Sequence, residues 1–280
     1  MFRKVFKYDM KSVGRIVAVL VPAVILMAVV AGLMTRVYGD DVSDMFFILR
    51  MTTGVLIFFC LLVVSAFSAA VTILCLRRYY THFFSDEGYL TFTLPVKRGT
   101  LLWSKTLSAF VIVLASVIVQ IISALAFIVC VPDGWSTFSK IASNAAAYLF
   151  PRYIPLVILV LFTCAASLFG GLALMHFSLT VGHAAAKKHS VLAAIGIWYG
   201  ISAIKNTVTQ IIGFAYLTSM DVYSTVDMTV DPVAAAEEIQ SSVMNQMTIY
   251  MLIFLIFEAA CFFLFYFLNY RMLKNRLSLS

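Results

Sequence analysis

Charged residues are scarce in this chain. They make up 12% of its 280 residues, whereas about a quarter of the residues in a soluble globular domain are charged. Hydrophobic residues make up 62% of the chain. These proportions exclude an ordinary soluble fold and are typical of an integral membrane protein.

The sequence also lacks the motifs of common enzymes and metal sites. It contains no Gly-x-x-x-x-Gly-Lys-Ser/Thr phosphate loop, no His-Glu-x-x-His zinc motif and no nucleophile with a plausible base partner. Its five cysteines show no paired spacing and its four histidines no ligand spacing. We therefore expect no catalytic residue, no metal site and no cofactor bound by this chain itself.

Six long apolar stretches predict six transmembrane helices. A bilayer core requires about 20 consecutive apolar residues per helix. Strands of a membrane barrel would instead alternate apolar and polar residues over about ten positions. We therefore expect an all-α polytopic membrane protein. The predicted spans cover roughly residues 15–36, 51–76, 107–131, 153–181, 190–217 and 247–270.

The cations predict how the chain is oriented. Fifteen of the 20 Lys and Arg residues lie in four segments: 1–15, 77–105, 182–189 and 271–280. Nine of the 13 acidic residues lie in three others: 36–50, 132–152 and 218–246. Because Lys and Arg near helix ends stay on the cytoplasmic side, we expect a multi-pass protein of the cell membrane with both termini inside. The net charge of +7 then reflects topology, and no nucleic-acid partner is expected.

The first residues predict a helix at the inner membrane interface. In segment 1–14, Phe2, Phe6 and Met10 share one helical face, and the basic residues lie away from it. Such a helix lies flat, with its apolar side against the acyl chains and its cations near anionic headgroups. A charged tail that only fixes the topology is the alternative.

A second helix is predicted outside the membrane, between the fifth and sixth spans. Within segment 218–246, Asp231 is placed as an N-cap and Pro232 as the first helical residue. The helix could be a lid over a substrate path or an inert surface element.

Two charged residues, Lys205 and Glu258, lie deep in the predicted spans. At a rise of 1.5 Å per residue, they are about 18 and about 16 Å from the outer edge, so their depths are similar. An isolated charge there costs at least about 2.5 to 3.5 kcal/mol on insertion scales. The pair could join the fifth and sixth spans, or it could line a translocation path together with Asn206, Gln210 and Gln120.

The connection between the second and third spans is longer than a turn requires. It contains the stretch SDEGYLTFTLPVKRGTLLWSK, which resembles the corresponding cytoplasmic loop of type-2 ABC transporter permeases from Gram-positive bacteria. The six-span layout also matches that family. The resemblance lies in a Phe-rich approach followed by Glu-Gly-Tyr-Leu, Leu-Pro and Ser-Lys, which here are Phe83, Phe84, Glu87, Gly88, Tyr89, Leu90, Leu94, Pro95, Ser104 and Lys105.

This resemblance implies that segment 77–106 is held by a separate ABC ATPase subunit, which would bind ATP and Mg²⁺. A second permease chain, identical or homologous, is implied as well. Aromatic side chains dominate interface energetics, so a short helix that carries them is a suitable handle. A loop that lies on the membrane, anchored by Tyr89, Phe92 and Trp103, is the alternative. The residues expected to couple to the ATPase are Phe83, Phe84, Asp86, Glu87, Gly88, Tyr89, Leu90, Phe92 and Pro95.

The expected function is therefore that of a membrane-spanning permease subunit of an ATP-driven exporter. Its substrate would be amphipathic or hydrophobic, and peptide, lipid and drug export are all compatible with the sequence. Membrane lipids are expected around the helices. One alternative is an ion-coupled secondary transporter or channel that uses Lys205 and Glu258, although no convincing internal repeat supports it. A non-transporting membrane scaffold or immunity protein is the other.

Overall fold

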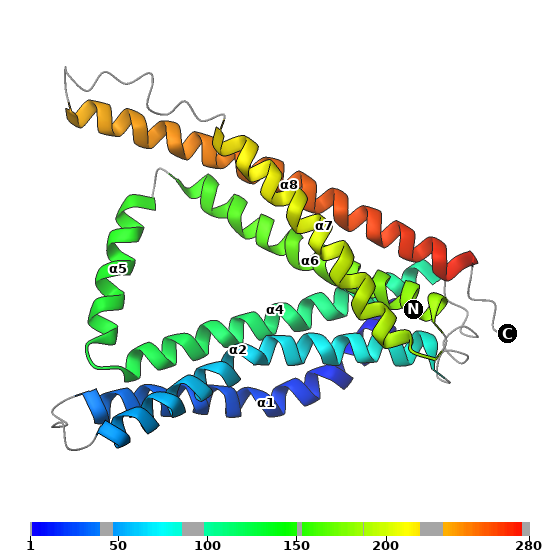
Figure 1. Ribbon diagram of the computed structural model, residues 1–280, viewed down its shortest axis with the longest axis horizontal. Helices are drawn as coiled ribbons and strands as arrows, with labels where there is room; N and C mark the ends of the chain where they lie inside the picture. The colour runs from blue at the N-terminus through cyan, green and yellow to red at the C-terminus, as the bar shows by residue number, and fades with distance from the viewer. Residues whose placement is uncertain are drawn as a thin grey trace. The chain divides into compact units, whose positions relative to one another are not determined.

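The protein is built from helices (Figure 1). The computed structural model describes residues 2–39, 47–85, 98–149, 153–186, 188–218 and 232–275. No strand occurs among these residues, and six of the helices are long and apolar enough to cross a membrane. The prediction of an all-α polytopic membrane protein with six spans is thus confirmed. The helices are α1 (Phe2–Gly39), α2 (Phe47–Phe84), α4 (Arg98–Cys130), α5 (Gly134–Leu149), α6 (Ile154–Ala185), α7 (Ser190–Thr218) and α8 (Pro232–Asn275).

The chain folds as two compact units, residues 1–151 and 152–280. In the first unit, α1, α2 and α4 pack side by side along their length (Figure 1). Small residues allow this packing. A Cβ atom added to Gly32 of α1 would lie 2.8 Å from the carbonyl oxygen of Phe127 in α4, closer than side chains tolerate. Close backbone contact of this kind is typical of membrane helices, whose association depends on packing and not on the hydrophobic effect.

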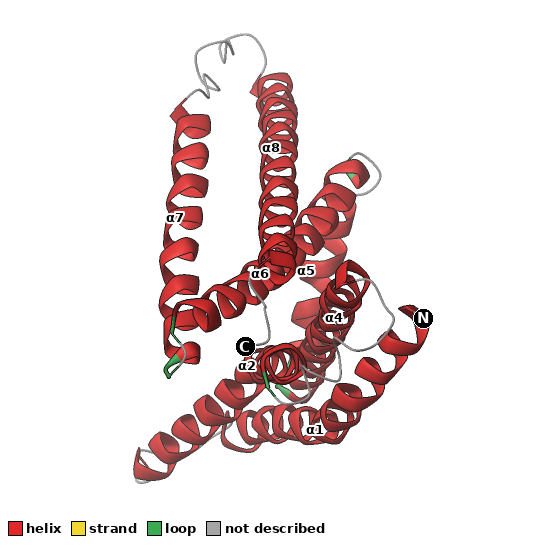
Figure 2. Cartoon of the chain, turned by 90° about the vertical axis from the view of Figure 1, so that its right-hand side faces the viewer, coloured by secondary structure: helices red, strands yellow, loops and turns green. Residues whose placement is uncertain are grey.

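In the second unit, α6 packs against both α7 and α8. The latter two helices stand apart over much of their length, as Figure 2 shows. A Cβ atom added to Gly182 would lie 2.6 Å from the backbone nitrogen of Ala194, so α6 and α7 meet closely at the turn that joins them. A small apolar core of Ala173, Leu174 and Phe265 holds α6 on α8.

The predicted interfacial helix at residues 1–14 is not a separate element. It forms the first turns of α1, which runs without a break from Phe2 to Gly39. Asp9 is buried and the neighbouring Phe6 and Met10 are partly buried. Protein thus covers part of the predicted apolar face, and the position of these turns at the membrane interface stays a prediction.

The predicted external helix also belongs to a longer one. It begins at Pro232, as expected from the proline, but it continues as α8 through the sixth span to Asn275. No residue between Pro232 and the span breaks the helical pattern. The predicted N-cap Asp231 and the rest of the preceding connection lie outside the described residues.

Helix α5 was not predicted. It follows a turn in which Asp133 has a φ of 51°, and an added Cβ at Gly134 would lie 2.2 Å from the carbonyl oxygen of Ile128. The rings of Trp135 and Phe138 contact each other with centroids 5.8 Å apart. With Trp135 exposed, α5 has the aromatic-rich apolar side that helices at membrane interfaces carry.

Candidate functional site

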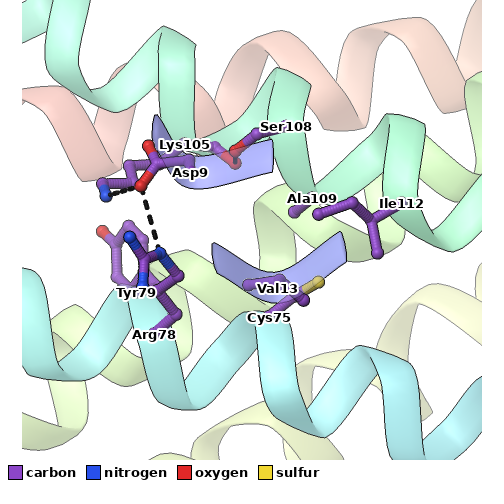
Figure 3. Close-up of a pocket in the computed structure, with 9 residues that line it drawn as sticks. All are labelled: Asp9, Val13, Cys75, Arg78, Tyr79, Lys105, Ser108, Ala109 and Ile112. Carbon is purple, nitrogen blue, oxygen red and sulfur yellow. Dashed lines mark hydrogen bonds and ion pairs between the residues drawn. The ribbon is translucent and has the colours of Figure 1, made fainter. Parts of the chain in front are cut away.

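Three charged side chains from α1, α2 and α4 meet in the first unit (Figure 3). Asp9 of α1 accepts hydrogen bonds at its Oδ1 atom from Lys105 Nζ at 2.5 Å and from Arg78 Nε at 3.1 Å. Arg78 also donates to the hydroxyl of Ser12. Arg78 lies about two turns before the end of α2 and Lys105 about two turns after the start of α4, so a single carboxylate ties these parts of α2 and α4 to α1.

This charge cluster is mostly shielded from solvent. The side chains of Asp9 and Lys105 are 4% and 6% exposed, whereas that of Arg78 is 24% exposed. Two cations share one acid, so the cluster carries a net charge of +1. Atom Oδ2 of Asp9 has no hydrogen-bond partner among the described residues. A cavity of about 10 Å³ adjoins the cluster, close to the smallest space that holds one water molecule.

Aromatic packing stiffens the end of α2. Tyr79 and Phe83 are fully buried and their ring centroids lie 4.8 Å apart. Tyr80 and Phe84 form a second pair at 5.6 Å. The Phe83 ring therefore packs inside the first unit at the end of α2, and Phe84 is partly buried beside it.

Most residues expected to couple to an ATPase remain predictions. Only the two phenylalanines just named are within the described part of the chain. The other predicted coupling residues lie outside it, and these are Asp86, Glu87, Gly88, Tyr89, Leu90, Phe92 and Pro95.

A second charged contact lies within the membrane-spanning part of the second unit. Lys205 Nζ of α7 donates to Glu258 Oε2 of α8 at 2.7 Å. The Glu258 side chain is 2% exposed and that of Lys205 14%. A Cβ atom added to Gly170 of α6 would lie 3.0 Å from Glu258 Oε2 and 3.9 Å from Lys205 Nζ. The predicted ion pair is thus present, and the missing side chain at Gly170 makes room for it against α6.

The polar residues predicted to accompany this pair have different surroundings. Asn206 and Gln210 are exposed on α7. Gln120 donates to the carbonyl oxygens of Val64 at 3.0 Å and Ser65 at 3.2 Å. Its amide thereby ties α4 to α2 within the first unit. A role for these three residues on a translocation path stays a prediction.

Two buried polar features were missed from the sequence. One is the contact of Asp9 with Arg78 and Lys105. The other is a hydrogen bond of 2.7 Å from Thr180 of α6 to Asn269 of α8, both buried. Each has a signal in the sequence, because an acid among apolar positions of α1 and an amide within an apolar helix both require a partner.

Comparisons with known proteins identified no relative of this chain. No protein family, curated protein or solved structure matches the chain. Within the described residues, no group of three or more His, Cys, Asp or Glu side chains could hold a metal ion. The candidate sites are therefore defined by their own geometry: the charge cluster of the first unit and the ion pair of the second.

Proposed function

We propose that this chain is the permease subunit of an ATP-driven ABC exporter in the cell membrane. It would work with a separate ATPase subunit that binds ATP and Mg²⁺, and it would contain no ATPase site of its own. Six spans per chain suggest half of a transport unit, so two permease chains, identical or homologous, would meet with two ATPase subunits. The exported substrate would be amphipathic or hydrophobic, such as a peptide, a lipid or a drug.

The observation that carries this proposal is the charge cluster that ties α2 and α4, the helices on either side of segment 86–97, to α1. When the ATPase subunits close around ATP, they can move the membrane helices only by pushing on a segment that is rigidly attached to those helices. Arg78 and Lys105 are fixed to Asp9 through buried charged hydrogen bonds, which are among the stronger contacts in proteins. A force on the connection would therefore reach α1, α2 and α4 together. The resemblance of this connection to the permease loop supports the same function.

The ion pair of the second unit does not favour an ion-coupled transporter. Lys205 and Glu258 neutralise each other at 2.7 Å and are packed against Gly170. The midplane ion sites of secondary transporters are typically formed by broken helices, whereas α7 and α8 both continue unbroken past the pair. We therefore treat the pair as a structural contact between α7 and α8.

The proposal is tested by purification with a tag from the native membrane in mild detergent. The wild-type chain should carry a vanadate-sensitive ATPase, and the double variant Tyr89→Ala/Phe92→Ala should retain about tenfold less of it, because aromatic anchors carry most interface energy. The variant Trp135→Ala/Phe138→Ala is the matched control, since it removes an aromatic pair from α5 on the opposite side of the membrane in the predicted topology. Equal ATPase retention in both variants would contradict the proposal, as would transport by a chain without any ATPase.

A further inference from the structure

A basic groove lies on one face of α1, where the helix enters its apolar part. Its volume is about 470 Å³, and it is lined by Tyr8, Lys11, Ser12, Arg15 and Ile16. Successive positions are one or three residues apart and span two turns, so they form one side of the helix. All five side chains are exposed. The groove thus combines two cations, two hydroxyl groups and an apolar end.

The groove carries positive charge, and no acidic side chain is among the residues that line it. Asp9 is the sole acidic residue in the sequence of α1, and its carboxylate is buried and already bound by Lys105 and Arg78. Arg78 also donates to Ser12, one of the lining residues, so a third cation is bonded to a side chain of the groove. The groove therefore favours a negatively charged ligand.

The same face of α1 continues as an exposed apolar stripe. Ile16, Val19 and Leu26 are 50%, 73% and 61% exposed. They follow the helical spacing that keeps residues on one side. From Ile16 to Leu26 the helix rises about 15 Å, which is the depth of one leaflet of a hydrocarbon core about 30 Å thick. A ligand with a negative head and a long apolar tail fits this combination.

We propose that this groove binds an anionic phospholipid. Lys11 and Arg15 contact the phosphate, and the hydroxyl of Tyr8 lies at the headgroup level, where amphipathic aromatic residues are enriched. One acyl chain then follows Ile16, Val19 and Leu26 into the membrane. An acidic peptide or a nucleic acid would contact the cations of the groove but not the apolar stripe. A lipid contacts both, so lipid is the ligand that the whole surface favours. This inference does not depend on the ATPase partner.

The test is native mass spectrometry of the purified chain titrated with phosphatidylglycerol and, separately, with phosphatidylcholine. The double variant Lys11→Gln/Arg15→Gln should bind phosphatidylglycerol about 30-fold more weakly, since each cation near anionic lipid contributes about a fivefold effect. The matched control is Lys188→Gln/Arg271→Gln, which removes the same charge from exposed positions of the second unit. The control should change the affinity by less than about threefold.

Three results would overturn the proposal. Equal losses in the two double variants would mean that only overall charge attracts the lipid. Equal wild-type affinity for phosphatidylcholine would remove the anionic preference. Competition by soluble glycerol phosphate at the same concentration as phosphatidylglycerol would show that the phosphate binds without the stripe. If the double variant does not fold, the single variants Lys11→Gln and Arg15→Gln give the same comparison, each with a loss of about fivefold.

Discussion

The ion pair between α7 and α8 allows a quantitative prediction. Lys205→Met keeps a long side chain but removes its charge, and Glu258→Gln keeps the shape of the carboxylate. Either change alone leaves one charge buried in a low-dielectric environment. At the depth of these residues an unpaired charge costs about 2.5 to 3.5 kcal/mol on insertion scales, and breaking a buried pair costs about 3 to 5 kcal/mol. Each single variant should therefore lower the free energy of unfolding by about 3 kcal/mol or more.

The double variant should be much milder. It leaves no buried charge, only an amide without its partner, which costs about 1 to 3 kcal/mol. The coupling energy of the cycle should then reach about 3 kcal/mol, the upper end of the range for residues in contact. Unfolding in mixed dodecyl maltoside and SDS micelles can be followed by tryptophan fluorescence, because Trp198 of α7 packs on the core of the second unit. Additive losses would refute the pairing. A stable double variant that no longer transports would place the two residues on the substrate path.

Three further predictions follow from close contacts. Gly170→Val should lower the free energy of unfolding by about 1 to 3 kcal/mol, because an added Cβ lies 3.0 Å from Glu258 Oε2. Gly171→Val is the control in the same detergent-unfolding assay, since nothing lies within 4 Å of its added Cβ. Asp9→Asn should lower it by about 3 kcal/mol, since two cations lose their shared carboxylate, and a thermal-unfolding midpoint equal to that of the wild type would contradict this. Gln120→Leu removes the hydrogen bonds to α2 and should cost only about 0.6 kcal/mol, the average for polar contacts between membrane helices; a loss above 2 kcal/mol in detergent unfolding would show a larger role.

The six spans could be predicted because the bilayer thickness sets a minimum length for an apolar stretch, and that length can be read directly from the sequence. The contact between Lys205 and Glu258 could be predicted for a similar reason, since depth follows from residue number and each charge needs a partner. The third span extends further than its apolar stretch. Helix α4 begins at Arg98, whereas the prediction began at about residue 107, because Leu102 and Lys105 are buried within the helix bundle.

What could not be predicted depends on contacts between distant segments. Nothing near Asp9 in the sequence indicates that its partners are Arg78 and Lys105, which are 69 and 96 residues away. That contact also holds the first turns of α1 against α2 and α4, since the buried acid bonds to one cation of each. Helix α5 was missed because a 16-residue amphipathic helix is too short to register as a span.

The most direct test of the central claim, coupling through segment 86–97 to an ATPase, is photo-crosslinking in intact membranes. Tyr89→p-benzoylphenylalanine places a reactive group in the segment, and Phe138→p-benzoylphenylalanine places the same group on α5 as the control. The proposed function predicts a light-dependent adduct from position 89 with a protein that binds ATP, and none from position 138. The claim would be contradicted if position 89 formed adducts only with lipid or if the ATP-binding protein attached only at position 138.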